Sequence, residues 1–185
     1  MTLRAELAGL LVNAGLSDVD VDEAVADEQL RSSVYRRVVL TAAGSANRAG
    51  DRAIVGVLLR DPIAMKGRTA VVLLVDSIAR KAGDPAEFRR WAAGILPEID
   101  RLAAGKDRDF LLARVRDWSF RLSIEDGKVP SPDELAGVTD WMQRTLAETT
   151  ASRPVLALLA GSGRTEKIRN IAKNRAGTGG AARPR

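Results

Sequence analysis

Apolar side chains recur at helical spacing along most of this chain of 185 residues. Segment 108–124 shows the pattern most clearly, because its apolar residues fall at i, i+4, i+7 and i+11, which share one face of an α-helix. These residues are Leu111, Val115, Trp118 and Leu122. A similar stripe in 132–149 consists of Leu135, Val138, Met142 and Leu146. Both segments are predicted to be amphipathic helices, and we expect Trp91, Trp118 and Trp141 to lie in the core.

Capping residues and glycines divide the chain into ten predicted helices. Asp84-Pro85 and Ser131-Pro132 each place an N-cap side chain before a proline that suits the first helical position, with a glutamate three residues after the cap. Gly83, Gly105 and Gly127 stand where helices are expected to end. The predicted helices span 3–15, 22–44, 51–59, 62–82, 85–93, 95–104, 108–124, 132–149, 154–160 and 165–176.

Three apolar segments also allow a different interpretation. Residues 53–59, 69–75 and 153–163 could be buried strands of a nucleotide-binding sheet, because the first two are β-branched and almost continuously apolar. We favour helices there, since helix caps rather than hairpin turns flank these segments. The predicted fold class is all-α, either a helical bundle or a short stack of helical repeats. Its expected parts are an acidic N-terminal helical cap (1–30), a helical core domain (31–160), a basic C-terminal helix (161–176) and a disordered tail (177–185).

The composition removes several classes of chemistry. The chain has no His and no Cys, which excludes zinc sites of thiolate and imidazole, Ser-His-Asp triads, cysteine nucleophiles and disulfides. A D-x-D-x-D pattern at Asp18, Asp20 and Asp22 lacks the glycine that a calcium loop needs at its sixth position. No paired constellation of carboxylate, Lys or Ser side chains stands out. We therefore expect a non-enzymatic protein without a cofactor and without a metal site.

Charge is distributed unevenly along the chain. The formal net charge is +5, and Arg far outnumbers Lys, which is typical of GC-rich coding sequences and favours a bacterial source. Residues 1–30 carry a net charge of −6 and residues 151–185 one of +7. These ends could attract each other, a second copy of the chain, an acidic protein or a polyanion. No uncharged apolar run is long enough for a membrane span and no signal peptide is evident, so we expect a cytoplasmic protein.

One region resembles a known repeat family. Leu58-Leu59-Arg60-Asp61-Pro62 precedes a predicted helix that carries Arg68, and Gly83-Asp84-Pro85 follows it. This order resembles a HEAT-type helical repeat. A poorer copy has its aspartate at Asp107, 46 residues after Asp61, within the usual period of about 40–47 residues. The resemblance covers 50–124 but not 131–176, and a bundle without repeats is the alternative. It implies a scaffold that presents a helical surface to a protein or nucleic-acid partner.

The basic C-terminal helix and the tail after it form the candidate nucleic-acid-binding site. Gly161-Ser162-Gly163 is followed by Lys167, but it matches neither phosphate-loop fingerprint, so we interpret it as a turn with Thr165 as the next helix cap. The two flanking helices suggest a helix-turn-helix that lacks a third helix after it. Apolar residues occupy one face of the last helix, and amide and cationic side chains occupy the other. The predicted nucleic-acid-binding residues are Arg164, Lys167, Arg169, Asn170, Lys173, Asn174 and Arg175. A solvated helix and an acidic protein partner remain open alternatives.

Overall fold

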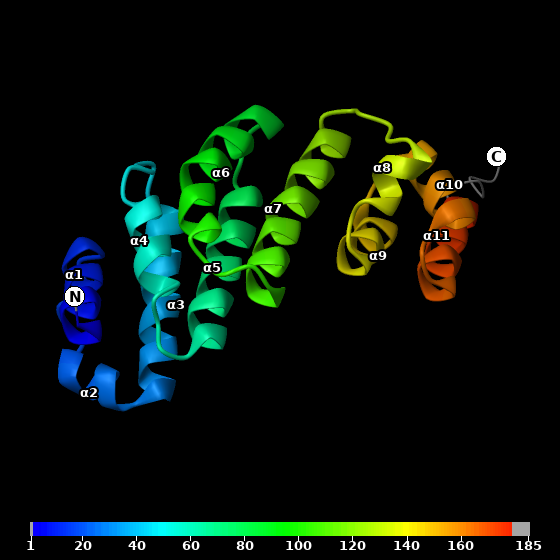
Figure 1. Ribbon diagram of the computed structural model, residues 1–185. Helices are drawn as coiled ribbons and strands as arrows, with labels where there is room; N and C mark the ends of the chain where they lie inside the picture. Colours follow the sequence, from blue (N-terminus) through cyan, green and yellow to red (C-terminus); the bar gives the residue numbers. More distant parts are fainter. Residues whose placement is uncertain (1, 179–185) are drawn as a thin grey trace. The chain divides into compact units, whose positions relative to one another are not determined.

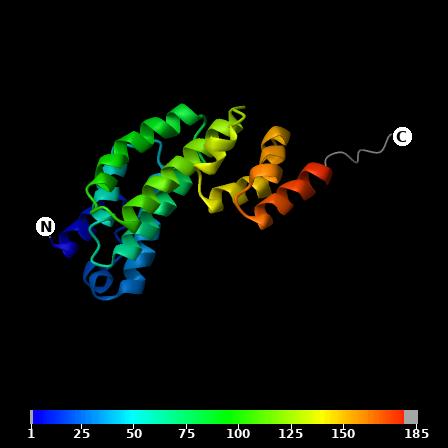
Figure 2. The same cartoon turned by 45° about the vertical axis from the view of Figure 1, so that its right-hand side comes forward.

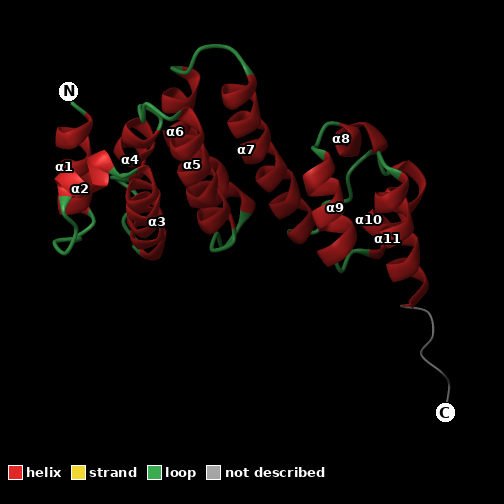
Figure 3. Ribbon diagram, turned by 90° about the horizontal axis from the view of Figure 1, so that it is seen from below, coloured by secondary structure: helices red, strands yellow, loops and turns green. Residues whose placement is uncertain are grey.

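The computed structural model describes residues 2–178, which form eleven helices and no strand (Figures 1 and 3). The all-α prediction is confirmed. The strand alternative is wrong, because α4, α5 and α10 cover the three segments concerned. The helices are α1 (Leu3–Asn13), α2 (Val21–Ala26), α3 (Glu28–Gly44), α4 (Asp51–Leu58), α5 (Ala64–Ala79), α6 (Pro85–Asp100), α7 (Lys106–Glu125), α8 (Pro132–Ala136), α9 (Asp140–Thr149), α10 (Arg153–Ser162) and α11 (Glu166–Thr178). Of the tail expected over 177–185, the first two residues belong to α11, and 179–185 lie outside the described residues.

Two predicted helices are each divided in the structure. Asp27 adopts an extended conformation that ends α2, and its side chain accepts hydrogen bonds from the N–H groups of Gln29 and Leu30 at 2.7 and 3.0 Å. It therefore caps α3 and breaks the predicted helix 22–44. Residues 137–139 break the predicted helix 132–149 in the same way, because Thr139 is extended and caps α9.

Two other predicted helices form one. We expected a break at Gly94, yet α6 continues through Gly94 and Pro97. Its buried residues Phe88, Ala92, Ile95 and Ile99 make a single stripe at i, i+4, i+7 and i+11. Burial of a large apolar side chain contributes about 1.5–3 kcal/mol, whereas a glycine within a helix costs only about 1 kcal/mol. The free energy gained by burying this stripe therefore outweighs the tendency of Gly94 to end the helix.

Contacts divide the chain into two compact units, 1–115 and 116–185, with the division inside α7. The limits that we expected at 30/31 and 160/161 fall within these units. In the first unit α3 lies against α5 and α4 against α6, while α1 and α2 pack beside them (Figures 1 and 3). The segment 1–30 contributes Leu7, Leu10 and Leu11, all buried, to the core of this unit.

The second unit has its own hydrophobic core, to which α7 contributes Ile124. Helix α11 packs on both α9 and α10 (Figure 2). The core residues of α8 to α11 are Leu135, Val138, Met142, Leu146, Ala147, Val155, Leu156, Leu159, Ile168 and Ala172. Helices α9, α10 and α11 thus contribute most of one apolar cluster, to which α7 and α8 add one residue each.

The three tryptophans differ in burial. Trp118 is buried, as expected. Trp91 is only half-buried and donates its indole N–H to the buried carboxylate of Asp51 at 2.8 Å. Trp141 is 38 % exposed, so its expected core position is wrong. Its ring packs edge-on against Trp118, with ring centroids 6.1 Å apart.

Glu98 on α6 predicts a pH-dependent contribution to stability. Its carboxylate accepts hydrogen bonds from Arg52 at 2.8 Å and from Arg101 at 2.5 Å, and the bond from Arg52 is the main cause that lowers its pKa. Such a group stabilises the fold above its unfolded pKa of about 4.3, and this stabilisation is lost as the pH falls through the lower folded value. Because both arginines are half-exposed, we expect Glu98→Gln to cost about 1 kcal/mol at pH 7. Urea unfolding should show that the difference from the wild type shrinks as the pH falls below about 4.3 and disappears once the pH is below the folded pKa of Glu98. A difference that persists in acid would contradict this assignment.

Candidate functional site

Helix α11 presents a polar arc away from the core of the second unit. Ile168 and Ala172 are buried in that core. Lys167, Asn170 and Lys173 are exposed on the other side, and Asn174 is exposed beside them. We call these four residues the α11 arc. No apolar side chain interrupts the arc, and Glu166 is the one acidic residue of α11. The side chains of the α11 arc can donate hydrogen bonds to anions, and the amides of Asn170 and Asn174 can also accept hydrogen bonds.

The arginines among the predicted site residues contact the protein itself. Arg164 donates to the carbonyl oxygens of Ala136 and Val138 at 2.6 and 2.9 Å and forms an ion pair of 2.7 Å with Asp140. These acceptors lie where α8 ends and α9 begins. Cations are favourable at the carbonyl end of a helix, so Arg164 stabilises the connection between these helices.

Arg169 and Arg175 make similar contacts. Arg169 donates to the carbonyl of Gly163 at 2.7 Å, and Arg175 donates to that of Ala147 at 3.0 Å. Both side chains are half-buried. The structure therefore separates the seven predicted residues into two groups. The four residues of the α11 arc are exposed, whereas three arginines bind backbone carbonyls of the second unit.

The turn between α10 and α11 is short and closely packed. Gly163 is buried, and a Cβ atom placed there would lie 2.6 Å from the carbonyl oxygen of Leu159 and 2.8 Å from Ile168. The predicted cap is confirmed, since Thr165 accepts from the N–H of Ile168 at 3.3 Å. Buried Gln143 on α9 accepts from the N–H of Arg164 at 2.8 Å. This turn holds α11 at a fixed position on α9 and α10.

Our expectation about the third helix was incomplete. In the described residues no helix follows α11, but α9, which precedes α10 in the chain, packs against both α10 and α11. The apolar stripe through Met142 and Leu146 was visible in the sequence. What could have identified α9 as a separate helix is Thr139, a good N-cap residue that follows Gly137 closely.

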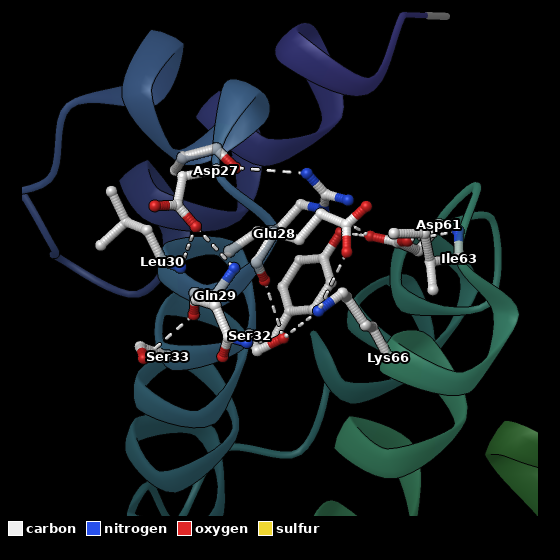
Figure 4. A network of polar contacts seen from close by, with 12 residues as sticks. Asp27, Glu28, Gln29, Leu30, Ser32, Ser33, Asp61, Ile63 and Lys66 are labelled. Atoms are coloured by element: carbon white, nitrogen blue, oxygen red, sulfur yellow. Dashed lines mark hydrogen bonds and ion pairs between the residues drawn. The ribbon is translucent and has the colours of Figure 1, made fainter.

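The first unit contains a buried polar network that the sequence analysis missed (Figure 4). Asp61, in the turn between α4 and α5, accepts from Arg31 at 2.8 Å and from the hydroxyl of Tyr35 at 2.7 Å. Its other oxygen accepts from the N–H of Ile63 at 2.7 Å. Arg31 also donates to the carbonyl of Val25 at 2.8 Å. Burial, together with the hydrogen bond to Asp61, raises the pKa of Tyr35, so its hydroxyl stays protonated as a donor.

A second, more exposed Arg–Asp pair lies two helices further along. Arg68 on α5 forms an ion pair with Asp107 at the start of α7, just as Arg31 on α3 pairs with Asp61 before α5. Both aspartates are those of the HEAT-like segments. The membership of a HEAT-type family nevertheless stays a prediction.

A groove of about 550 Å³ opens between α3 and α5, next to the buried network. Its lining is mostly apolar on the α5 side and polar on the α3 side. Lys66 of α5 lies within it and donates to Ser32 of α3 at 3.1 Å (Figure 4). The other lining residues are Glu28, Arg36, Ile63, Met65, Thr69, Ala70 and Leu73. We call it the α3–α5 groove.

Ser32 and Lys66 resemble a nucleophile and base only by proximity. The hydroxyl of Ser32 donates to the carbonyl of Glu28 at 2.9 Å. The ammonium of Lys66 donates to Ser32 and lies 3.7 Å from the carboxylate of Glu28. A base would have to accept the hydroxyl proton instead. The polar contacts here serve to join α3 to α5.

Among residues 2–178, no group of three or more metal-binding side chains comes together, and no helix has the length and hydropathy of a membrane span. Comparison of the chain with protein-family models, with curated proteins and with solved structures gives no match.

Proposed function

We propose that the second unit binds nucleic acid through the α11 arc. The observation that carries this proposal is that Lys167, Asn170, Lys173 and Asn174 share one exposed side of a helix that three internal arginine contacts and a tight turn hold in place. A helix of this width fits the major groove of a duplex. The absence of apolar side chains from the arc favours a polar, charged partner.

The roles of the two residue types differ. Lys167 and Lys173 would neutralise phosphates, which supplies affinity without regard to sequence. Asn170 and Asn174 carry paired donors and acceptors, which suit hydrogen bonds to base edges. Arg164 would act as a positioning residue, since its donors are bound to Ala136, Val138 and Asp140.

The salt dependence of binding tests the lysines. We expect the wild-type protein to bind a fluorescent duplex with an affinity that falls steeply as salt increases. The double substitution Lys167→Gln/Lys173→Gln should weaken binding about tenfold or more at low salt and reduce the slope of log K against log salt by about 2. Lys106→Gln is the matched control, because Lys106 is an exposed lysine at the first residue of α7 in the other unit.

The asparagines give a second measurement. Asn170→Ala should leave the salt slope unchanged and reduce the preference between duplex sequences. Circular dichroism checks that each variant keeps its helix content. The proposed function would be refuted if the wild type and the double lysine variant bound the duplex equally well. It would also be refuted if Lys106→Gln lost as much affinity as the double lysine variant.

A further inference from the structure

The α3–α5 groove of the first unit has a mostly apolar wall on α5 that the described residues leave open. Met65 is 62 % exposed at its edge, and Leu73 is half-buried two turns further along α5. Ile63, which is also half-buried, lies at the entrance to α5. An exposed methionine next to other apolar side chains is typical of a surface that receives a partner.

The walls of the groove favour an α-helix as its occupant. Both walls are helices, whose backbone N–H and C=O groups bond within each helix, so no sheet edge is available to an extended peptide. Met65, Thr69 and Leu73 follow one another at intervals of four residues and form a ridge of the kind that packs against a third helix. The stretch from Ile63 to Leu73 corresponds to about 15 Å of helix, or about three turns of an occupant.

Charge distinguishes the two ends of the groove. At the Ser32 end, Glu28 and Lys66 lie 3.7 Å apart and largely compensate each other. At the other end, Arg36 is exposed and makes no hydrogen bond or ion pair with any residue in 2–178. This end therefore attracts a carboxylate.

The same charges argue against two other occupants. The C-terminal residues 179–185 carry two arginines and no acid, which does not complement Arg36 and Lys66. A phosphate backbone would meet the carboxylate of Glu28 and a mostly apolar wall.

From these observations we infer that the α3–α5 groove binds an acidic amphipathic helix of another protein. Apolar side chains of that helix, spaced at i, i+3 or i+4 and i+7, lie against Met65, Thr69 and Leu73. An aspartate or glutamate near one end pairs with Arg36. This site shares no residue with the α11 arc, so an experiment can refute either proposal without refuting the other.

A designed peptide can test the inference on the full-length chain. The probe is a helical 14-residue peptide with leucines at i, i+4 and i+7 and glutamates beside them, and its control carries lysines in place of the glutamates. With methyl-labelled methionines, the signal of Met65 should shift as the acidic probe is added. The signal of Met142, which is fully buried in the second unit, should stay in place.

Charge reversal makes the test specific. Arg36→Glu should weaken binding of the acidic probe about three- to tenfold and strengthen binding of the lysine peptide. Lys106→Glu, an exposed position of the same unit away from the groove, should change neither affinity. Lys167→Gln/Lys173→Gln should also leave peptide binding unchanged. No shift of Met65 at millimolar probe, or equal shifts with both peptides in wild type and Arg36→Glu, would overturn the inference.

Discussion

Asp61→Asn should destabilise the first unit by about 3–5 kcal/mol, a large part of the 5–15 kcal/mol typical of a folded domain. The side chains of Asp61 and Arg31 are 0 % and 3 % exposed, so the substitution leaves the guanidinium charge of Arg31 buried without its counter-ion. It also turns the acceptor for Tyr35 into an amide that has only one oxygen. Urea unfolding of the purified variant, followed by circular dichroism, measures the loss.

An exposed ion pair provides the matched control. Asp18 pairs with Arg37 at 2.8 Å, with side chains 66 % and 45 % exposed. Asp18→Asn should therefore leave the stability almost unchanged. Replacing both Arg31 and Asp61 by Met and Leu should recover much of the stability lost in Asp61→Asn, because no charge is then left uncompensated. Equal losses at Asp61 and Asp18 would show that the buried pair is not what makes Asp61 important.

Gly67→Ala should be the second severe substitution, with a loss of about 3 kcal/mol. A Cβ at Gly67 would lie 1.9 Å from the carbonyl oxygen of Leu58, at the end of α4. Backbone atoms cannot move aside as a flexible side chain can, so α4 and α5 would have to separate. Thermal unfolding should show a large decrease in Tm.

Gly94→Ala tests the same chemical change without the collision. Gly94 lies inside α6, and a Cβ there would meet no atom within 4 Å. Because alanine is the better helix former, this variant should gain about 0.5–1 kcal/mol. If both glycine substitutions changed the stability in the same direction, the close approach at Gly67 would not be the cause of the effect of Gly67→Ala.

The sequence predicted the fold class because helical periodicity and capping are local signals. Ser131 and Asp84 begin α8 and α6 where their caps and prolines indicated. The error at α6 arose because burial of an apolar stripe outweighs a helix-breaking residue. Gly94 looks like a helix end, and only the continuation of the stripe into Ile95 and Ile99 shows that α6 does not stop there.

The candidate site was predicted by residue type but not by role. A helical wheel distinguishes the two faces of α11, and it placed Asn170 and Lys173 correctly on the side away from Ile168. A wheel cannot show that Arg169 bends back to Gly163 or that Arg164 reaches α8, because these contacts join segments up to 28 residues apart. The α3–α5 groove was missed for the same reason, since facing residues of its walls, such as Ser32 and Lys66, are 34 positions apart in the sequence.

The separation of the tryptophans between the two cores provides built-in optical reporters. Trp91 and the lone Tyr35 belong to the first unit, whereas the edge-on pair Trp118 and Trp141 belongs to the second. With phenylalanine at both positions of the pair, fluorescence follows the melting of α6 and its neighbours alone; with phenylalanine at Trp91, it follows α7 and α9. Comparing the two variants then shows, without an added dye, whether the first and second units, which share α7, unfold cooperatively.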